Sequence, residues 1–128
     1  MGKDVEDRDN AVKPTSEPAE IGGVPEGFAV IRPQGRLDLN GVGNLDALLA
    51  EAAARNPRCI VDLSLVVFLS SVGIRALIHA ARDLRAKGGG MVLLSPMQDV
   101  EKVLMVSGIA GLIPLARDLA EAIAMAGS

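Results

Sequence analysis

Asp62-Leu-Ser-Leu-Val-Val-Phe-Leu-Ser-Ser-Val-Gly-Ile-Arg75 is the stretch of the chain that decides the fold. It overlaps a compact apolar run, Cys59-Ile-Val-Asp-Leu, which is typical of a strand inside a sheet covered on both faces. From the end of the stretch onward, apolar residues recur at the helical period, and they are Ile74, Leu77, Ile78, Ala81 and Leu84. We therefore predict a buried strand, a loop that ends in Ser70 and Ser71, and an amphipathic helix.

The segment before this stretch also alternates between strand and helix patterns. Phe28 to Ile31 is predicted as a short strand, and Pro33 and Gly35 mark a turn or a bulge after it. A helix follows, and Asn56-Pro57 ends it. The apolar face of that helix consists of Leu45, Leu48, Leu49, Ala52 and Ala53.

The segment after the stretch repeats the alternation. Lys87-Gly-Gly-Gly ends the second helix, and Met91-Val-Leu-Leu reads as another buried strand. Ser95-Pro96-Met-Gln98 predicts an N-cap, a proline at the first helical position and a capping-box glutamine. The third helix is then expected to bury Val100, Val103 and Leu104 and to stop at Gly108, and Asp118-Leu-Ala-Glu121 is expected to cap a last helix.

Strands separated by helices imply βαβ units with right-handed crossovers. The predicted fold class is therefore α/β, with a small, mostly parallel mixed β-sheet and about four α-helices packed against it. Residues 1–18 are polar, contain two prolines and show no periodicity, so we predict a disordered N-terminal tail followed by one domain over residues 19–128.

Composition and charge exclude several classes of function. The chain has 128 residues, two Phe, and neither Tyr nor Trp. The net charge of −3 arises in residues 1–20, which hold six acidic and three basic side chains. A neutral domain without aromatic stacking platforms is not typical of a nucleic-acid-binding protein. Without a signal stretch, a disulfide or an apolar run long enough to insert into a membrane, the chain is expected to be cytoplasmic.

The side chains offer little for catalysis. One histidine, His79, and one cysteine, Cys59, cannot form a multi-histidine or thiolate metal cluster. We therefore expect no catalytic residues, no metal, no cofactor and no enzymatic activity. Ser70 and Ser71 allow two interpretations: either of them caps the helix that follows, or one of them is a phosphorylation switch at a helix N-terminus, which tolerates added negative charge.

Three stretches resemble the STAS domain, the fold of bacterial anti-sigma factor antagonists. They are Gly35-Arg36-Leu37-Asp38, then Val61-Asp62-Leu63-Ser64 through Phe68-Leu69-Ser70-Ser71-Val72-Gly73-Ile74, then Val103-Leu104 through Gly108-Ile109 to Ile113-Pro114-Leu115. The resemblance covers about residues 20–126. It implies a partner-switching regulator that binds an anti-sigma factor, itself a serine kinase of the histidine-kinase-like ATPase type, and that is inactivated when this kinase phosphorylates a serine at the helix start.

The resemblance also implies which residues meet the partner. They are Asp38, Ser70, Ser71, Val72, Gly73 and Arg75. The familiar motif places the modified hydroxyl immediately before the glycine, as Asp-Ser-Ser-Gly or Asp-Ser-Thr-Gly, whereas this chain has Val72 there. The expected phosphoacceptor is Ser71, with Ser70 as the alternative. Two other functions stay open: a constitutive, non-phosphorylated STAS subunit of a transport or sensory complex, and a small-molecule-binding STAS module.

Overall fold

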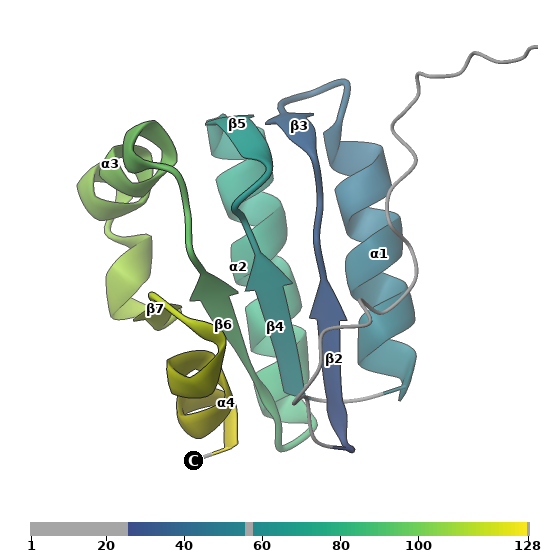
Figure 1. The fold of residues 1–128 in the computed structure, drawn as a ribbon. Coiled ribbons are helices and arrows are strands. Elements are labelled where there is room, and N and C mark those ends of the chain that lie inside the picture. Colours follow the sequence, from purple (N-terminus) through teal and green to yellow (C-terminus); the bar gives the residue numbers. More distant parts are fainter. Residues whose placement is uncertain (1–25, 56–57, 128) are drawn as a thin grey trace, which may run out of the picture.

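A four-stranded parallel sheet forms the centre of the molecule (Figure 1). The computed structural model describes residues 26–55 and 58–127, so the predicted tail over residues 1–18 and the predicted helix end at Asn56-Pro57 lie outside the described residues. The strand order is β2-β4-β6-β7, and all three pairings are parallel. The strands are β2 (Phe28–Ile31), β4 (Arg58–Asp62), β6 (Gly90–Leu94) and β7 (Leu115–Ala116).

Four helices pack around the strands, as predicted. They are α1 (Val42–Arg55), α2 (Ser71–Ala86), α3 (Gln98–Ser107) and α4 (Leu119–Gly127). Helices α1 and α2 pack side by side on one face of the sheet, while α4 packs on β4, β6 and β7 from the other face (Figure 1). The central strands are apolar on both sides for this reason: Cys59 and Val61 face the larger core with α1 and α2, and Ile60 faces the smaller core with α4.

A second, two-stranded parallel sheet extends beyond the carboxyl ends of β2 and β4 (Figure 1). It pairs β3 (Gly35–Leu37) with β5 (Val66–Leu69), and its register shifts between Gly35 and Arg36. The bulge predicted near Gly35 is thus confirmed, and the glycine adopts φ +80° there. The predicted loop before Ser70 is wrong over β5, because the strand is short and both Val67 and Phe68 are exposed, which leaves no alternating pattern to detect.

Asp62 fixes the path from β4 into β5. It is the one buried charged residue among the side chains whose burial the structure describes. Its Oδ2 accepts a hydrogen bond from Arg32 Nε at 2.9 Å, and its Oδ1 accepts one from the Ser64 backbone N–H at 2.9 Å. A buried carboxylate is costly unless it is paired and hydrogen-bonded, and this one is both. The turn after β4, and with it the position of β5, follows from this arrangement.

The predicted start of α3 is wrong. The helix begins at Gln98, and its N-cap position is held by Met97 without a side-chain hydrogen bond. Ser95 instead adopts φ +52° and donates its hydroxyl to the carbonyl oxygen of Arg117 at 2.9 Å, which ties the end of β6 to the end of β7. Val103 is exposed rather than buried. None of the helices over residues 26–55 and 58–127 is both long and apolar enough to span a membrane.

The predicted cap of α4 is confirmed. The Glu121 backbone N–H donates to Asp118 Oδ1 at 2.8 Å, and Glu121 Oε1 accepts from the Arg117 backbone N–H at 2.8 Å. These two bonds satisfy donors that would otherwise be free at the helix start. The predicted end of α3 is also right, because Gly108 occupies the C-cap position with φ +80°.

Candidate functional site

The chain turns from β3 into α1 around the carboxylate of Asp38. Its Oδ1 accepts hydrogen bonds from the backbone N–H groups of Asn40 at 3.1 Å and Gly41 at 3.2 Å. Its backbone carbonyl oxygen accepts from the N–H groups of Gly41 at 3.0 Å and Val42 at 2.9 Å. Aspartate is favoured before a helix because a short acceptor can reach these free donors. Asp38 therefore shapes the start of α1.

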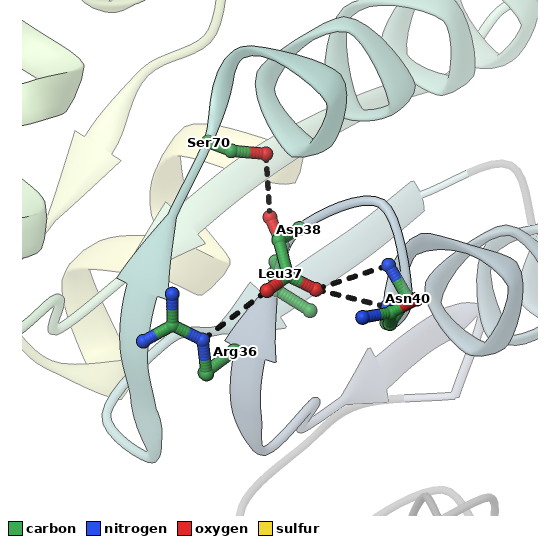
Figure 2. Close-up of polar contacts among 6 residues, drawn as sticks. Arg36, Leu37, Asp38, Asn40 and Ser70 are labelled. Carbon is green, nitrogen blue, oxygen red and sulfur yellow. Dashed lines mark hydrogen bonds and ion pairs between the residues drawn. The ribbon is translucent and has the colours of Figure 1, made fainter.

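Arg36 pairs with the other oxygen of the same carboxylate. Its Nε lies 3.2 Å from Asp38 Oδ2. Figure 2 shows the two side chains joined by this contact. The hydrogen bond from the Arg36 guanidinium holds the pKa of Asp38 below its ordinary value of 3.8, and the N–H groups of Gly41 and Asn40 act in the same direction. The Asp38 carboxylate is therefore ionised at neutral pH. Both of its oxygens already accept hydrogen bonds from neighbouring residues, so its main role is to stabilise the turn.

Ser70 connects the start of α2 to the end of β3. Its hydroxyl donates to the carbonyl oxygen of Leu37 at 3.1 Å (Figure 2). Its backbone N–H donates to the same oxygen at 3.1 Å. Ser70 has the extended backbone of an N-cap residue, yet its side chain caps no N–H group of α2. The capping interpretation is therefore wrong for Ser70, because its hydroxyl is used across the β3–α2 junction.

Gly73 lets α2 approach β3 this closely. It is buried in the first turn of α2. A Cβ atom added there would lie 2.7 Å from the Leu37 carbonyl oxygen and 2.7 Å from Leu69 Cδ1, distances that a real side chain does not occupy. The absence of a side chain is a packing requirement at this position, since both neighbours belong to strands β3 and β5.

Ser71, Val72 and Arg75 lie on the outer surface of α2. Ser71 is the first residue of the helix, its side chain is exposed, and its hydroxyl has no hydrogen-bond partner in the described part of the chain. Val72 is half-buried, and Arg75 is exposed one turn further along. The structure thus gathers Asp38, Ser70 and Gly73 around Leu37, with Ser71 beside them. No side-chain hydrogen bond or ion pair joins Arg75 to this group within residues 26–55 and 58–127.

Sequence reasoning missed one pair of residues at this site. The guanidinium carbon of Arg36 lies 4.2 Å from the ring centroid of Phe68, on the neighbouring strand β5. The stacking could not be predicted while β5 was taken for a loop, because only strand pairing places Arg36 opposite Phe68. The signal in the sequence was the aromatic residue itself, one of only two in the chain.

Comparison with known proteins gives a family match. A family model of the STAS domain matches residues 20–122. BtrV of Bordetella bronchiseptica, whose name describes it provisionally as an anti-sigma factor antagonist, is 29% identical over 92 residues, which cover 71% of this chain and 79% of BtrV.

Solved structures share the fold. The anti-sigma factor antagonist SpoIIAA of Bacillus, in its unphosphorylated form, is 28% identical with a TM-score of 0.62, over 74% of this chain and 84% of SpoIIAA. The murine anion transporter Slc26a9 is 16% identical with a TM-score of 0.66, over 79% of this chain and 18% of the transporter, which shows a common fold alone.

Proposed function

The chain belongs to the STAS domain family, and on that premise we propose that it is an anti-sigma factor antagonist that acts by binding an anti-sigma factor. The proposed partner is also a serine kinase of the histidine-kinase-like ATPase type. Binding would occupy this partner and free its sigma factor, so the chain works by docking and needs no chemistry of its own. The names of BtrV and SpoIIAA support this assignment over the other members of the family. The proposal places the chain in the cytoplasm with its partner.

One observation carries the proposed docking surface. The β3–α1 turn and the start of α2 are 33 residues apart in sequence but share the Leu37–Ser70 junction. A partner that covers this junction would meet Asp38, Ser70, Ser71, Val72 and Arg75 at once, with Gly73 holding α2 in place beneath them. A surface built from two connected elements keeps its shape before binding, which lowers the entropic cost of association.

Phosphorylation at Ser71 is the proposed control. Its hydroxyl is exposed and free of partners in the described residues, whereas the Ser70 hydroxyl must first leave the Leu37 carbonyl oxygen. A phosphate adds about −1.5 to −2 charges, and a helix N-terminus favours negative charge, so the domain should stay folded while its docking surface changes. SpoIIAA offers a parallel, since it has been solved in both phosphorylated and unphosphorylated forms.

The test is a titration of the wild-type chain against purified histidine-kinase-like ATPases from the same cell, followed by incubation of each pair with labelled ATP. Saturable binding to one ATPase, release of a sigma factor from it and transfer of phosphate to the chain would support the whole proposal. Binding and release of the sigma factor without phosphate transfer would support the antagonist function but contradict its control by phosphorylation. The absence of binding to every such ATPase would overturn the proposed function.

A second function is favoured by Val72, which occupies the position of the usual acceptor hydroxyl. A constitutive, non-phosphorylated subunit of a transport or sensory complex would need no acceptor there, and the fold of this chain also occurs in the transporter Slc26a9. This alternative predicts that the wild-type chain co-purifies in fixed ratio with components of such a complex and takes up no phosphate.

A third function is favoured by a hollow of about 400 Å³ between β3 and the start of α1. Leu37, Leu45 and Leu48 form its apolar floor, and Asn40 and Asn44 stand at its rim. A small-molecule-binding module would show a ligand-dependent rise in melting temperature without any protein partner.

A further inference from the structure

Arg36 is held in position by two contacts that use only part of its guanidinium group. Its Nε donates to Asp38 Oδ2 at 3.2 Å, and its guanidinium carbon lies over the ring of Phe68, 4.2 Å from the centroid. Its two terminal amino groups have no acceptor in the described residues, and the side chain is 60% exposed. A guanidinium carries five donors in a fixed fork, so the outer edge of Arg36 keeps four of them available.

Such an edge matches a carboxylate. The two terminal amino groups of an arginine can donate two parallel hydrogen bonds to the two oxygens of an Asp or Glu side chain. The contacts with Asp38 and Phe68 restrict the rotation of Arg36 before any partner arrives. Less conformational entropy is then lost on binding, which is the usual gain from a preorganised group.

Exposed apolar side chains lie on β5, which pairs with the strand of this arginine, and in the turn that follows that strand. On β5, Phe68 is 39% exposed and Val67 is 55% exposed, and in the turn after Asp38, Leu39 is 76% exposed. Aromatic residues and arginine are enriched in the energetically dominant parts of protein–protein interfaces. Exposed leucine and valine beside them gain from contact with an apolar protein surface, and a free ion does not provide that contact.

We propose that Arg36, stacked on Phe68 and bonded to Asp38, is the anchor of the docking surface and receives a carboxylate from an Asp or Glu side chain of the protein partner. This inference rests on the proposed function and specifies the chemistry of its interface. A single carboxylate suits the site better than a phosphate dianion or a polyanion, because the Asp38 carboxylate lies on the other side of the same guanidinium.

Four variants test the anchor by titration against the ATPase that the wild-type chain binds. Arg36→Gln removes the charge and should weaken binding about 30-fold, the range of an interface hot spot. Arg36→Lys keeps the charge but loses the paired donors and the stacking, and should weaken binding about tenfold. Phe68→Leu removes the stacking platform and should weaken binding about fivefold. The control is Arg82→Gln, the same change on exposed α2 about 16 Å beyond Ser71, which should stay within about twofold.

A charge exchange identifies the partner group and separates weak binding from poor folding. Arg36→Glu should abolish binding, and an Asp→Lys or Glu→Lys change at the matching carboxylate of the ATPase should restore it. Rescue of that kind requires a folded Arg36→Glu chain, and melting curves of all variants provide a second check. If the wild type binds while Arg36→Gln binds equally well, the anchor is wrong and the proposed function stands. If the wild type binds no ATPase, the proposed function is wrong, and the anchor that rests on it is wrong as well.

Discussion

The Ser70 hydroxyl donates a hydrogen bond to the Leu37 carbonyl oxygen at 3.1 Å, and this bond ties the start of α2 to the end of β3. Leu37 is followed directly by Asp38, whose carboxylate shapes the turn into α1. The start of α2 is therefore connected to the turn that leads into α1 through the carbonyl group of a single residue, Leu37. The docking surface that we propose depends on this junction.

Ser70→Ala should lower the free energy of unfolding by about 1 kcal/mol, because it removes one partly buried hydrogen bond and leaves the backbone bond from the Ser70 N–H to the same oxygen. Urea unfolding followed by circular dichroism measures this change. Ser71→Ala is the matched control and should stay within about 0.5 kcal/mol, since its hydroxyl is exposed. Equal effects at the two serines would show that the Ser70 bond has no stabilising role.

Gly73→Ala should destabilise the domain by about 1–3 kcal/mol, because the added methyl group would lie 2.7 Å from the Leu37 carbonyl oxygen and from Leu69 Cδ1. Gly43→Ala in α1 is the control. A Cβ atom at Gly43 meets nothing within 4 Å, and alanine is the better helix former by about 1 kcal/mol. The two substitutions should therefore shift the urea midpoint in opposite directions, and a shift in the same direction would contradict the close approach of α2 to β3.

Much of the fold follows from short sequence patterns. The boundaries of β2 were predicted to the residue, and the apolar face of α1 is buried as its helical period indicates. Each of these elements buries a whole face in a core, so the spacing of its apolar residues is enough to predict it. The same reasoning failed for β5, which pairs only with β3 and leaves Val67 and Phe68 exposed, because a strand defined by its partner carries little signal of its own.

The candidate site was less predictable because its hydrogen bonds join distant segments. Ser70 and Ser95 both have the residue type of an N-cap, yet both hydroxyls donate to backbone carbonyl oxygens of distant residues, 33 and 22 positions away. A capping pattern identifies a serine that can bond a helix start, but tertiary acceptors compete for the same hydroxyl. The Asp118 cap was predicted correctly because the donor of its hydrogen bond lies only three residues further along the chain, so the whole pattern is visible in the sequence.

The stability of the domain should depend on pH through Asp38. Its folded-state pKa is lowered by the Arg36 hydrogen bond and by the Gly41 and Asn40 N–H groups, so ionised Asp38 favours the folded state. This contribution is fully present above the ordinary pKa of 3.8 and is lost as the pH falls through the lower folded-state value. The difference in unfolding free energy between wild type and Asp38→Asn should be constant at neutral pH and shrink in acid. A difference that does not change with pH would contradict this assignment.

Cys59 should react slowly with thiol reagents while the domain is folded. It is a free cysteine with 1% exposure in β4, and burial raises the pKa of its thiol to about 12, so the reactive thiolate is scarce at neutral pH. Ser71→Cys provides an internal reference, because it adds one exposed thiol to the same molecule. Mass spectrometry should show one fast and one slow label, and denaturant should remove the difference. Two fast labels without denaturant would contradict the burial of β4.

Phosphorylation is predicted at Ser71, and the variants there separate docking from control. Ser71→Ala should keep partner binding and lose phosphate transfer, while Ser71→Asp should fold normally and bind weakly, because a partner that accepts a neutral hydroxyl must now desolvate a charge. The full dianion of a phosphate should weaken binding by about a hundredfold, close to 3 kcal/mol. Titration of each variant against the kinase, with labelled ATP in parallel, measures both properties. Label on Ser71→Ala but not on Ser70→Ala would move the acceptor to Ser70, which would then have to give up its bond to Leu37 and loosen the junction between β3 and α2.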